Sequence, residues 1–396
     1  MKWRSGEKDA DGKLAIPDGW LFPHYYDGLT VLFRVENALR LFVYLVLKDR
    51  YGAKWKDLEI ASDEDAKTSI GALAKRRIEQ GKTFGYLSYP IQSPLMHLTS
   101  GELVRLITHD SYWPVFKDYF LAGKSVVTLK LQEIGVIRNA LAHFRPLSSN
   151  DVEVVKQNAN QMLSVVERTL IDLIQCGQNV PTNTPDDWYA QLRTLGTDLV
   201  SLRFSQSADE AWVRITLRQN LLIASGVPNP ERDWQSYRVI LIDGPALLQT
   251  QRSLADRVLF LTDRVPFLRL GDDLLPKGRK ELGLTFSRRV LTEAHAEVMS
   301  SLEESLAQIL KETDLLKEDQ LARGTLVQLR TLTARRTTYG NSTFWEIDHS
   351  ALKSQTPTEE LPEYWGQISA ESDFISDSEE YPWMPVKVSE DVVPFL

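Results

Sequence analysis

Apolar residues recur at helical spacing through the first half of the chain. Between residues 28 and 51 they fall on one side of a helix, at Leu32, Val35, Leu39, Phe42 and Val46. The same periodicity, with Gly and Pro as boundary signals, predicts further helices over 63–80, from Ser100, from Pro114, over 124–145 and over 151–175. No segment of this half alternates with period two, so we expect it to be all-helical.

The pattern changes in the second half of the chain. Residues 178–187 are polar and contain Pro181 and Pro185, which indicates a domain boundary. Beyond it, β-branched and alternating residues predict strands over 199–204, 211–217, 238–242 and 258–261. Helical spacing returns over 285–311 and 315–335. We therefore expect an α+β region.

The last part of the chain differs from both halves. Residues 354–396 carry ten carboxylates against Lys387 alone, and aromatic residues are interleaved with the acidic ones. A purely acidic tail would be disordered, but these rings could anchor it. The expected parts of the chain are an arm (1–24), a helical domain (25–180), an α+β domain (185–353) and an acidic tail (354–396).

Composition narrows the class of protein. The chain has 396 residues, 43% of them hydrophobic, which suits two or three domains with sizeable cores. Its net charge of −8 is not typical of a nucleic-acid-binding protein, although an acidic chain can hold a local basic cleft. Cys176 is its single cysteine, so it can form neither an internal disulfide nor a cysteine-based zinc site. With no apolar signal segment near Met1, we expect a soluble, cytoplasmic protein.

One segment combines residues suited to phosphodiester chemistry. In IRNALAHFRP (residues 137–146), Arg138 follows Leu131 and Ile134 along one apolar stripe, where an unpaired guanidinium is costly. We therefore expect the stripe of Leu131 and Ile134 to meet a second copy of the chain in a homodimer. His143 lies one turn after Asn139, at the end of the expected helix, where the helix dipole favours a protonated imidazole. An imidazole can move a proton while a guanidinium neutralises phosphate charge.

Arg followed by His at this spacing is a weak pattern by itself. Arg288 and Arg289 precede His295 at a similar distance, but Val290 stands where the first site has Asn139. We interpret this second pair as accidental. The ordinary alternative for the first pair is an interface arginine bound to Glu133 or Asp151, with His143 as a helix cap.

A second segment gives the motif its context. RVENALRLFVYLVLKDRYGAKW contains Glu36, a Leu39–Arg40 pair, a Tyr51–Gly52 pair and Trp55, and SYWPVFKDYF precedes the motif helix. Together with Arg-Asn-x3-His near the end of a penultimate helix, this order of segments resembles the HEPN superfamily of ribonucleases. The resemblance covers residues 25–180, and it implies an N-terminal all-α HEPN-like bundle followed by the α+β domain and the acidic tail.

The resemblance also implies a mechanism and a set of roles. HEPN domains dimerise, so that two Arg-x4-His motifs meet across a cleft and cut RNA without a metal or cofactor. Arg138 and His143 would then be catalytic, and Asn139 would orient the phosphate or the partner histidine. Three further residues would support the site or bind RNA: Glu36, Arg40 and Arg145.

The resulting hypothesis is a metal-independent endoribonuclease that acts as a toxin or in antiviral defence. Residues 185–396 would receive an antitoxin or a viral trigger, and the acidic tail would fold back and compete with RNA. One alternative is a catalytically silent HEPN dimer that scaffolds a sensor. Another is a hydrolase or transferase site within residues 190–350, for which we find no triad, metal spacing or phosphate loop.

Two further patterns have ordinary explanations. Ala122-Gly123-Lys124-Ser125 resembles the end of a phosphate loop, but Asp118 occupies the place of its first glycine. Residues 239–244 (VILIDG) resemble an ATPase strand with an acidic end, and without a phosphate loop we expect a core strand. The spacing of His97, His109 and His349 predicts no metal site.

Overall fold

The computed structural model describes most of the chain. The described residues are 7–8, 10, 14–15, 25–60, 68–84, 94–174, 176, 186–340, 342–348, 352 and 367–369. Six α-helices of the first half are α1 (Tyr25–Tyr51), α2 (Ile70–Phe84), α3 (Ser100–Thr108), α4 (Trp113–Phe116), α5 (Lys124–Ala142) and α6 (Ser149–Ile174). Three 3-10 helices lie between them, at Gly52–Asp57, Pro94–His97 and Lys117–Tyr119.

The helices predicted from apolar spacing are present, with shifted ends. The second helix begins at Ile70 and continues through Gly81 to Phe84, while residues 61–67 lie outside the described part. The motif helix α5 ends at Ala142, short of the expected residue 145. Ser148 caps α6, because its hydroxyl accepts from the Asp151 amide while the Asp151 carboxylate accepts from the Ser148 amide.

Helix α1 is buried on all sides along its middle. Every residue from 37 to 48 is buried, which is the expected fate of a helix that is apolar all round. One side contacts the other helices of the first half. The other side contacts the second half of the chain, since Trp212, Leu259 and Phe260 belong to the same hydrophobic core.

Polar side chains of α1 fasten this second contact. The Tyr44 hydroxyl donates to the Leu259 carbonyl at 3.1 Å, and the Lys48 ammonium donates to the Ala255 carbonyl at 2.9 Å. Lys48 is buried, so its charge is held among these acceptors. Asp49 accepts hydrogen bonds from Ser287 and Arg289 at the start of α10.

The second half is built on two sheets whose strands are antiparallel except for the parallel pair of β13 and β9. The five-stranded sheet has the order β13-β9-β10-β6-β5, and the four-stranded sheet has the order β12-β11-β8-β7. Their strands are β5 (Val200–Gln206), β6 (Trp212–Asn220), β7 (Leu222–Ser225), β8 (Trp234–Ile242), β9 (Phe260–Leu270), β10 (Pro276–Ser287), β11 (Val327–Tyr339), β12 (Ser342–Asp348) and β13 (Gln367–Ser369). The helices are α7 (Asp187–Leu192), α8 (Gly244–Thr250), α9 (Arg252–Ala255) and α10 (Arg288–Lys317).

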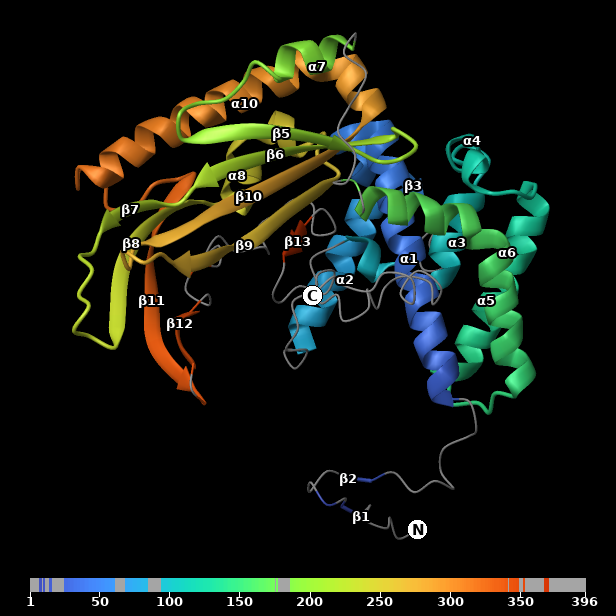
Figure 1. The fold of residues 1–396 in the computed structure, drawn as a ribbon. Helices are drawn as coiled ribbons and strands as arrows, with labels where there is room; N and C mark the ends of the chain where they lie inside the picture. The colour runs from blue at the N-terminus through green and yellow to red at the C-terminus, as the bar shows by residue number, and fades with distance from the viewer. Residues whose placement is uncertain are drawn as a thin grey trace.

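Helix α10 covers one face of the five-stranded sheet (Figure 1). Leu291, Val298 and Leu302 of α10 lie in one core with Val213, Ile215 and Leu217 of β6. The alternate β6 residues, Arg214, Thr216 and Arg218, are only partly buried because they point to the opposite face. Figure 1 shows that this opposite face looks toward the helical region, with α1 standing between the sheet and helices α3, α5 and α6.

The strands predicted in this half are confirmed, and one predicted helix is wrong. Residues 315–335 were expected to form a second helix after the one over 285–311. Instead α10 ends at Lys317, and β11 pairs with β8 on one side and β12 on the other. The threonines of β11 favour the strand, and cross-strand pairing decides the outcome. Residues 239–242 belong to the core strand β8, and Asp243 follows the strand as the cap of α8.

The expected fold class, an all-helical HEPN-like bundle followed by an α+β domain and an acidic tail, is wrong as a whole. The first half also contains two small sheets, β1 (Glu7–Lys8) with β2 (Leu14–Ala15), and β3 (Glu59–Ile60) with β4 (Thr68–Ser69). Part of the tail is β13, which pairs in parallel with β9, while the rest lies outside the described residues. The coarser order, a helical region followed by a sheet-rich region, holds.

Among the residues that the structure describes, no helix combines the length and the apolar character needed to span a lipid bilayer.

Candidate active site

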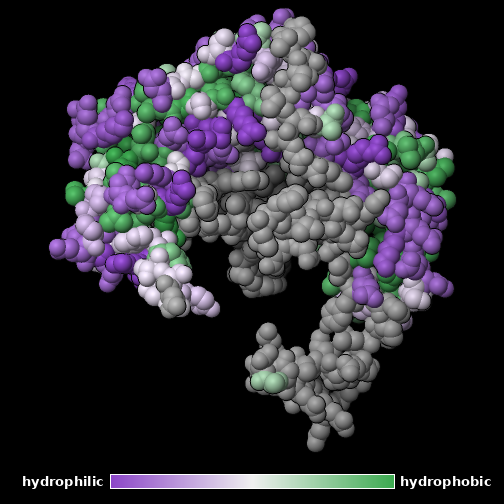
Figure 2. Space-filling view, in the orientation of Figure 1, coloured by the Kyte–Doolittle hydropathy of each residue, from purple (hydrophilic) through white to green (hydrophobic). Residues whose placement is uncertain are grey.

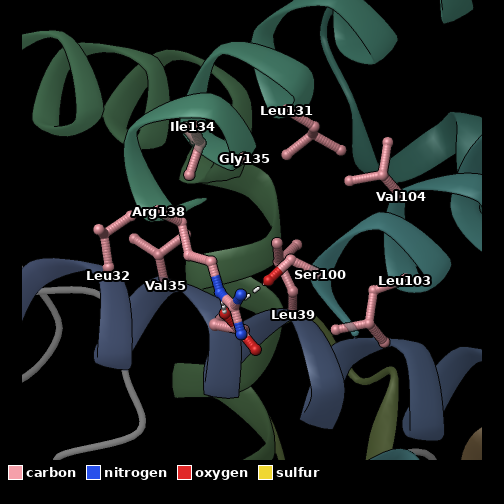
Figure 3. A pocket seen from close by; sticks show the side chains of 11 residues that line it. Leu32, Val35, Leu39, Ser100, Leu103, Val104, Leu131, Ile134, Gly135 and Arg138 are labelled. Carbon is pink, nitrogen blue, oxygen red and sulfur yellow. Dashed lines mark hydrogen bonds and ion pairs between the residues drawn. The ribbon is translucent and has the colours of Figure 1, made fainter. Parts of the chain in front are cut away.

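Arg138 leaves α5 toward the groove where α1 and α3 meet (Figure 3). Its Nε lies 3.4 Å from Glu36 Oε2, and its Nη1 donates to Asn139 Oδ1 at 3.4 Å. The side chain is 37% exposed, so the guanidinium is anchored on one side and reachable from solvent on the other. That combination suits a group that must meet an external anion in a fixed orientation.

Glu36 is the centre of a small polar network. One carboxylate oxygen accepts from Arg40, and the other accepts from the Ser100 hydroxyl at 2.6 Å as well as from Arg138. Arg40 also donates to the carbonyls of Leu95 and Leu98, before α3. The network therefore joins α1, α3 and α5 around a single carboxylate.

The protonation state of Glu36 follows from these neighbours. Burial alone would raise the pKa of its carboxyl group, but the charge of Arg40, the hydrogen bond from Ser100 and the charge of Arg138 outweigh it and lower the pKa. The carboxylate therefore stays ionised at neutral pH. It offers a fixed negative charge between two arginines and holds both in place.

A small apolar pocket lies directly behind Arg138. Its volume is about 20 Å³, little more than one water molecule occupies, and Figure 3 shows Leu32, Val35 and Ile134 around it. Gly135 forms part of the wall, and a side chain there would meet nothing within 4 Å. Within the described lining, the apolar walls leave Glu36 as the polar partner of the guanidinium, and Ser100 donates to that same carboxylate.

His143 is the residue that ends α5. Its amide donates to the Asn139 carbonyl, the Phe144 amide donates to the Leu141 carbonyl, and the Arg145 amide donates to the Ala140 carbonyl. This hydrogen-bond pattern is typical of a helix that ends with a residue in the left-handed conformation. Phe144 holds that position with φ of 55°, which is strained for a bulky side chain. The turn leaves His143, Phe144 and Arg145 exposed at one end of the helix.

Contacts with α1 hold this strained turn. The Phe144 ring stacks on Tyr25, with centroids 6.2 Å apart and planes 8° apart. Gly28 lies so close to the following segment that an added Cβ would be 2.8 Å from Leu147. The start of α1 therefore fixes the end of the motif helix, next to the exposed His143.

The predicted site residues fall into two groups. Arg138, Glu36, Arg40 and Asn139 meet in one hydrogen-bonded network. His143 and Arg145 lie exposed beyond it, at the helix end, without a hydrogen bond from their side chains to the described residues. A single chain thus presents the guanidinium and the imidazole on the same helix end, but it does not join them.

The ordinary explanation is right that His143 caps the helix and that Arg138 is ion-paired, but it named the wrong partners for Arg138. Glu133 accepts from Lys130 and Asn158, and Asp151 caps α6 through Ser148, so neither carboxylate binds Arg138. The actual partner, Glu36, lies 102 positions away in sequence. Ser100 was not anticipated, because a serine at the start of a helix usually has a local role.

The competing arginine–histidine pair has a structural role. Arg288 binds Asp186 and Glu210, and Arg289 binds Asp49 of α1 and Glu293. Both guanidiniums therefore fasten the start of α10 to its surroundings. His295 lies beside a kink at Ala294, whose φ of −136° departs from helical geometry.

Exposed apolar side chains border the candidate site. Leu29 and Phe33 lie on the first turns of α1, Leu129 and Val136 lie along α5, and Phe144 follows it. Val136 is 69% exposed and is one turn from Asn139 and two from His143, on the same side of α5. In contrast Leu131 and Ile134, from which a dimer interface was predicted, are buried within the chain.

Within the described ranges, no three His, Cys, Asp or Glu side chains are grouped as a metal site would require. Comparisons of the chain with family models, with characterised proteins and with solved structures find no match.

Proposed function

We propose that this chain is a metal-independent endoribonuclease whose reaction depends on Arg138 and His143. The observation that carries the proposal is the state of Arg138, a partly exposed side chain whose guanidinium is anchored by a largely buried, ionised carboxylate. Because Glu36 shares its charge with Arg40 as well, the solvent-facing side of the Arg138 guanidinium is left to meet an external anion. The motif's resemblance to HEPN ribonucleases supplies RNA as that anion and His143 as the proton carrier.

The chemistry would proceed through the ribose of the substrate. A neutral imidazole takes the proton of the 2′-hydroxyl, and the 2′-oxygen attacks the adjacent phosphorus. The bond from phosphorus to the 5′-oxygen breaks, and a protonated imidazole returns a proton to that oxygen. The products are a 2′,3′-cyclic phosphate and a 5′-hydroxyl, and the Arg138 guanidinium neutralises the charge that builds on the phosphoryl oxygens.

This reaction needs two imidazoles in opposite protonation states, which favours a homodimer. In one chain the guanidinium and His143 are both accessible but not bound to each other. A twofold axis close to the end of α5 would bring two copies of each together, since an isologous interface pairs the same patch from both subunits. Asn139 is exposed on the same side of α5 as His143, and it would then contact the phosphate or the partner's imidazole.

The interface we propose uses the exposed apolar residues around the site. Val136 and Leu129 share one face of α5 with Asn139, and Leu29 and Phe33 lie in the first turns of α1; all four side chains are exposed in the single chain. This replaces the stripe of Leu131 and Ile134, which already packs inside the chain.

The alternative function is a silent dimer that scaffolds the sheet region. It keeps the same interface but assigns Arg138 a purely structural role toward Glu36. The exposure of His143, in a turn that forces Phe144 into a strained conformation, favours the catalytic reading, since strain of this kind clusters at functional sites. A role as toxin or antiviral effector, with the sheet region receiving the trigger or antitoxin, follows from the resemblance alone.

Sequencing of RNA ends after brief induction of the full chain tests the proposal. New ends with cyclic phosphate and 5′-hydroxyl groups, absent when His143→Ala is induced, are the expected outcome. Equal numbers of such ends with both proteins would favour the silent dimer.

A further inference from the structure

A row of small and basic side chains crosses the inner face of the five-stranded sheet. Arg203 of β5 pairs with Thr216 of β6, Thr216 pairs with Gly283 of β10, and Gly283 pairs with Thr262 of β9. Directly paired residues point to the same face, which here is the face opposite α10. Figure 2 shows hydrophilic side chains interspersed with hydrophobic ones over the sheet region on the face turned to the viewer.

Gly283 makes this row concave. A Cβ at this position would lie 3.1 Å from Arg214 Cδ, so an alanine would press on the Arg214 side chain, and 3.4 Å from Thr262 Cβ, which is an ordinary contact. Glycine inside a strand weakens the strand and often marks a close approach by a ligand or another backbone. The cavity over it has a volume of about 230 Å³.

The lining of the cavity is cationic. Arg203 and Arg214 border it together with the hydroxyl groups of Ser205, Thr216 and Thr262. Its one acidic residue among the described lining, Glu281, accepts from Arg218 at 2.8 Å and is therefore already neutralised. Arg203 has no ion pair with any described carboxylate, so its charge can meet an anion in the cavity.

The two arginines differ in how firmly they are held. Arg214 donates through Nε to the Thr285 hydroxyl at 3.1 Å and through Nη2 to the Leu173 carbonyl at 3.2 Å, so its guanidinium has a fixed plane. The Arg203 side chain is exposed on the edge strand β5, so it can turn toward a ligand in the cavity. A fixed guanidinium beside a movable one is a suitable clamp for an oxyanion with several acceptor oxygens.

A buried donor completes the site. The Thr262 hydroxyl is buried and has no hydrogen-bond partner among the described residues, although buried hydroxyl groups almost always have one. It belongs to the same row as Arg203 and Gly283. An acceptor oxygen placed in the cavity would satisfy it.

We propose that this cavity binds a phosphate group, either inorganic or carried by a nucleotide or an RNA end. The volume far exceeds the roughly 30 Å³ of a water molecule and falls short of typical drug-sized sites, which suits phosphate with at most a small attached group. Arg214 also links the cavity to the helical region, because it donates to the carbonyl of Leu173 near the end of α6. Binding itself does not depend on the proposed nuclease activity.

Titration calorimetry on the full chain, at constant ionic strength, tests this proposal. The probes are inorganic phosphate, 5′-AMP and the dinucleotide ApA, which has only an internal phosphodiester. We expect saturable binding that falls about tenfold or more in Arg203→Gln and in Thr262→Val, since hydrogen bonds to charged groups contribute most to such sites. Arg238→Gln, an exposed arginine on the other sheet, is the matched control and should bind like the parent.

Thr262→Val separates binding from folding. It removes a hydroxyl group without a described partner, so the melting temperature should not fall while the affinity does. Tighter binding of AMP than of ApA identifies a terminal phosphate, and the reverse identifies the RNA backbone. Heats that do not saturate with any of the three probes, or equal affinity in Arg203→Gln and the parent, would overturn the proposal.

Discussion

Glu36 Oε2 and Arg138 Nε lie 3.4 Å apart, although 102 positions separate the two residues in sequence. Glu36 comes from a helix that is buried along its middle, whereas Arg138 comes from the exposed end of another helix. The pair thus links the core of the helical region to its surface. Because the carboxylate is ionised and shared with Arg40, the position of the guanidinium depends on a buried charge.

Replacing Glu36 tests this dependence. Glu36→Ala would leave the buried Arg40 without its counter-charge, and we expect a loss of about 3–5 kcal/mol in unfolding free energy. Glu36→Gln keeps the shape and an acceptor, so it should stay folded at neutral pH with a smaller loss. RNA cleavage by Glu36→Gln should still fall about 10²-fold, because Arg138 loses the charge that orients it.

The pH dependence of stability follows from the lowered pKa of Glu36. A group whose pKa is lower in the folded state stabilises the fold above its unfolded value of about 4.5, and this contribution disappears as the pH falls through the folded value. Denaturant melts of the parent and Glu36→Gln should therefore differ most at neutral pH and converge in acid. If the unfolding free energies of the two proteins differed by the same amount from pH 7 to pH 3, Glu36 would not be a carboxylate whose pKa the fold lowers.

The proposed dimer interface predicts a selective effect of charge. Val136→Glu should weaken the dimer by about 2 kcal/mol or more and reduce RNA cleavage, since a charge at the centre of an apolar interface is poorly tolerated. Leu310→Glu, on the exposed side of α10, is the control and should leave the oligomer unchanged. Light scattering at micromolar concentration measures both variants. A parent protein that is monomeric there and still cuts RNA would rule out a composite site.

Cys176 should be unreactive in the folded protein. Burial raises the pKa of its thiol to about 11, and its sulfur donates to the Trp212 carbonyl at 3.3 Å. Since the thiolate is the reactive form, a disulfide reagent at pH 8 should label the native chain slowly and the denatured chain at once. Rapid, stoichiometric labelling of native protein would show that the contact between Cys176 and β6 is not closed.

Sequence patterns predicted the helices and strands themselves better than they predicted what packs against each of them. The apolar run of α1 identified a helix, but periodicity cannot tell that its middle is enclosed by helices on one side and by Trp212 and Phe260 on the other. In β11 the leucines recur every third position by coincidence, and only pairing with β8 and β12 decides for a strand. Long-range pairing leaves little trace in a single sequence.

The same limit applies to the candidate site. The proximity of Glu36 and Arg40 to Arg138 was anticipated only through the resemblance of the first helix, because no local rule relates α1 to α5. Ser100 was missed, since its contact with Glu36 depends on how α3 lies against α1. Leu131 and Ile134 were assigned to a dimer interface because an apolar stripe in sequence does not show whether it meets its own chain or another.

The central claim is that Arg138 and His143 carry out RNA cleavage. Each alanine variant should lose about 10²–10⁴-fold in rate, the usual contribution of a general acid or base, while circular dichroism and melting remain close to the parent. His295→Ala is the matched control, because the arginines that precede His295 are engaged in structural ion pairs, and it should cut RNA normally.

The most direct measurement is the cleavage rate of a defined RNA by purified full-length protein, parent and His143→Ala, with a metal chelator present. We predict cleavage by the parent that leaves 2′,3′-cyclic phosphate ends, and a rate at least about 10²-fold lower for the variant. Undiminished cleavage by folded His143→Ala protein, or loss of cleavage in His295→Ala instead, would contradict the account.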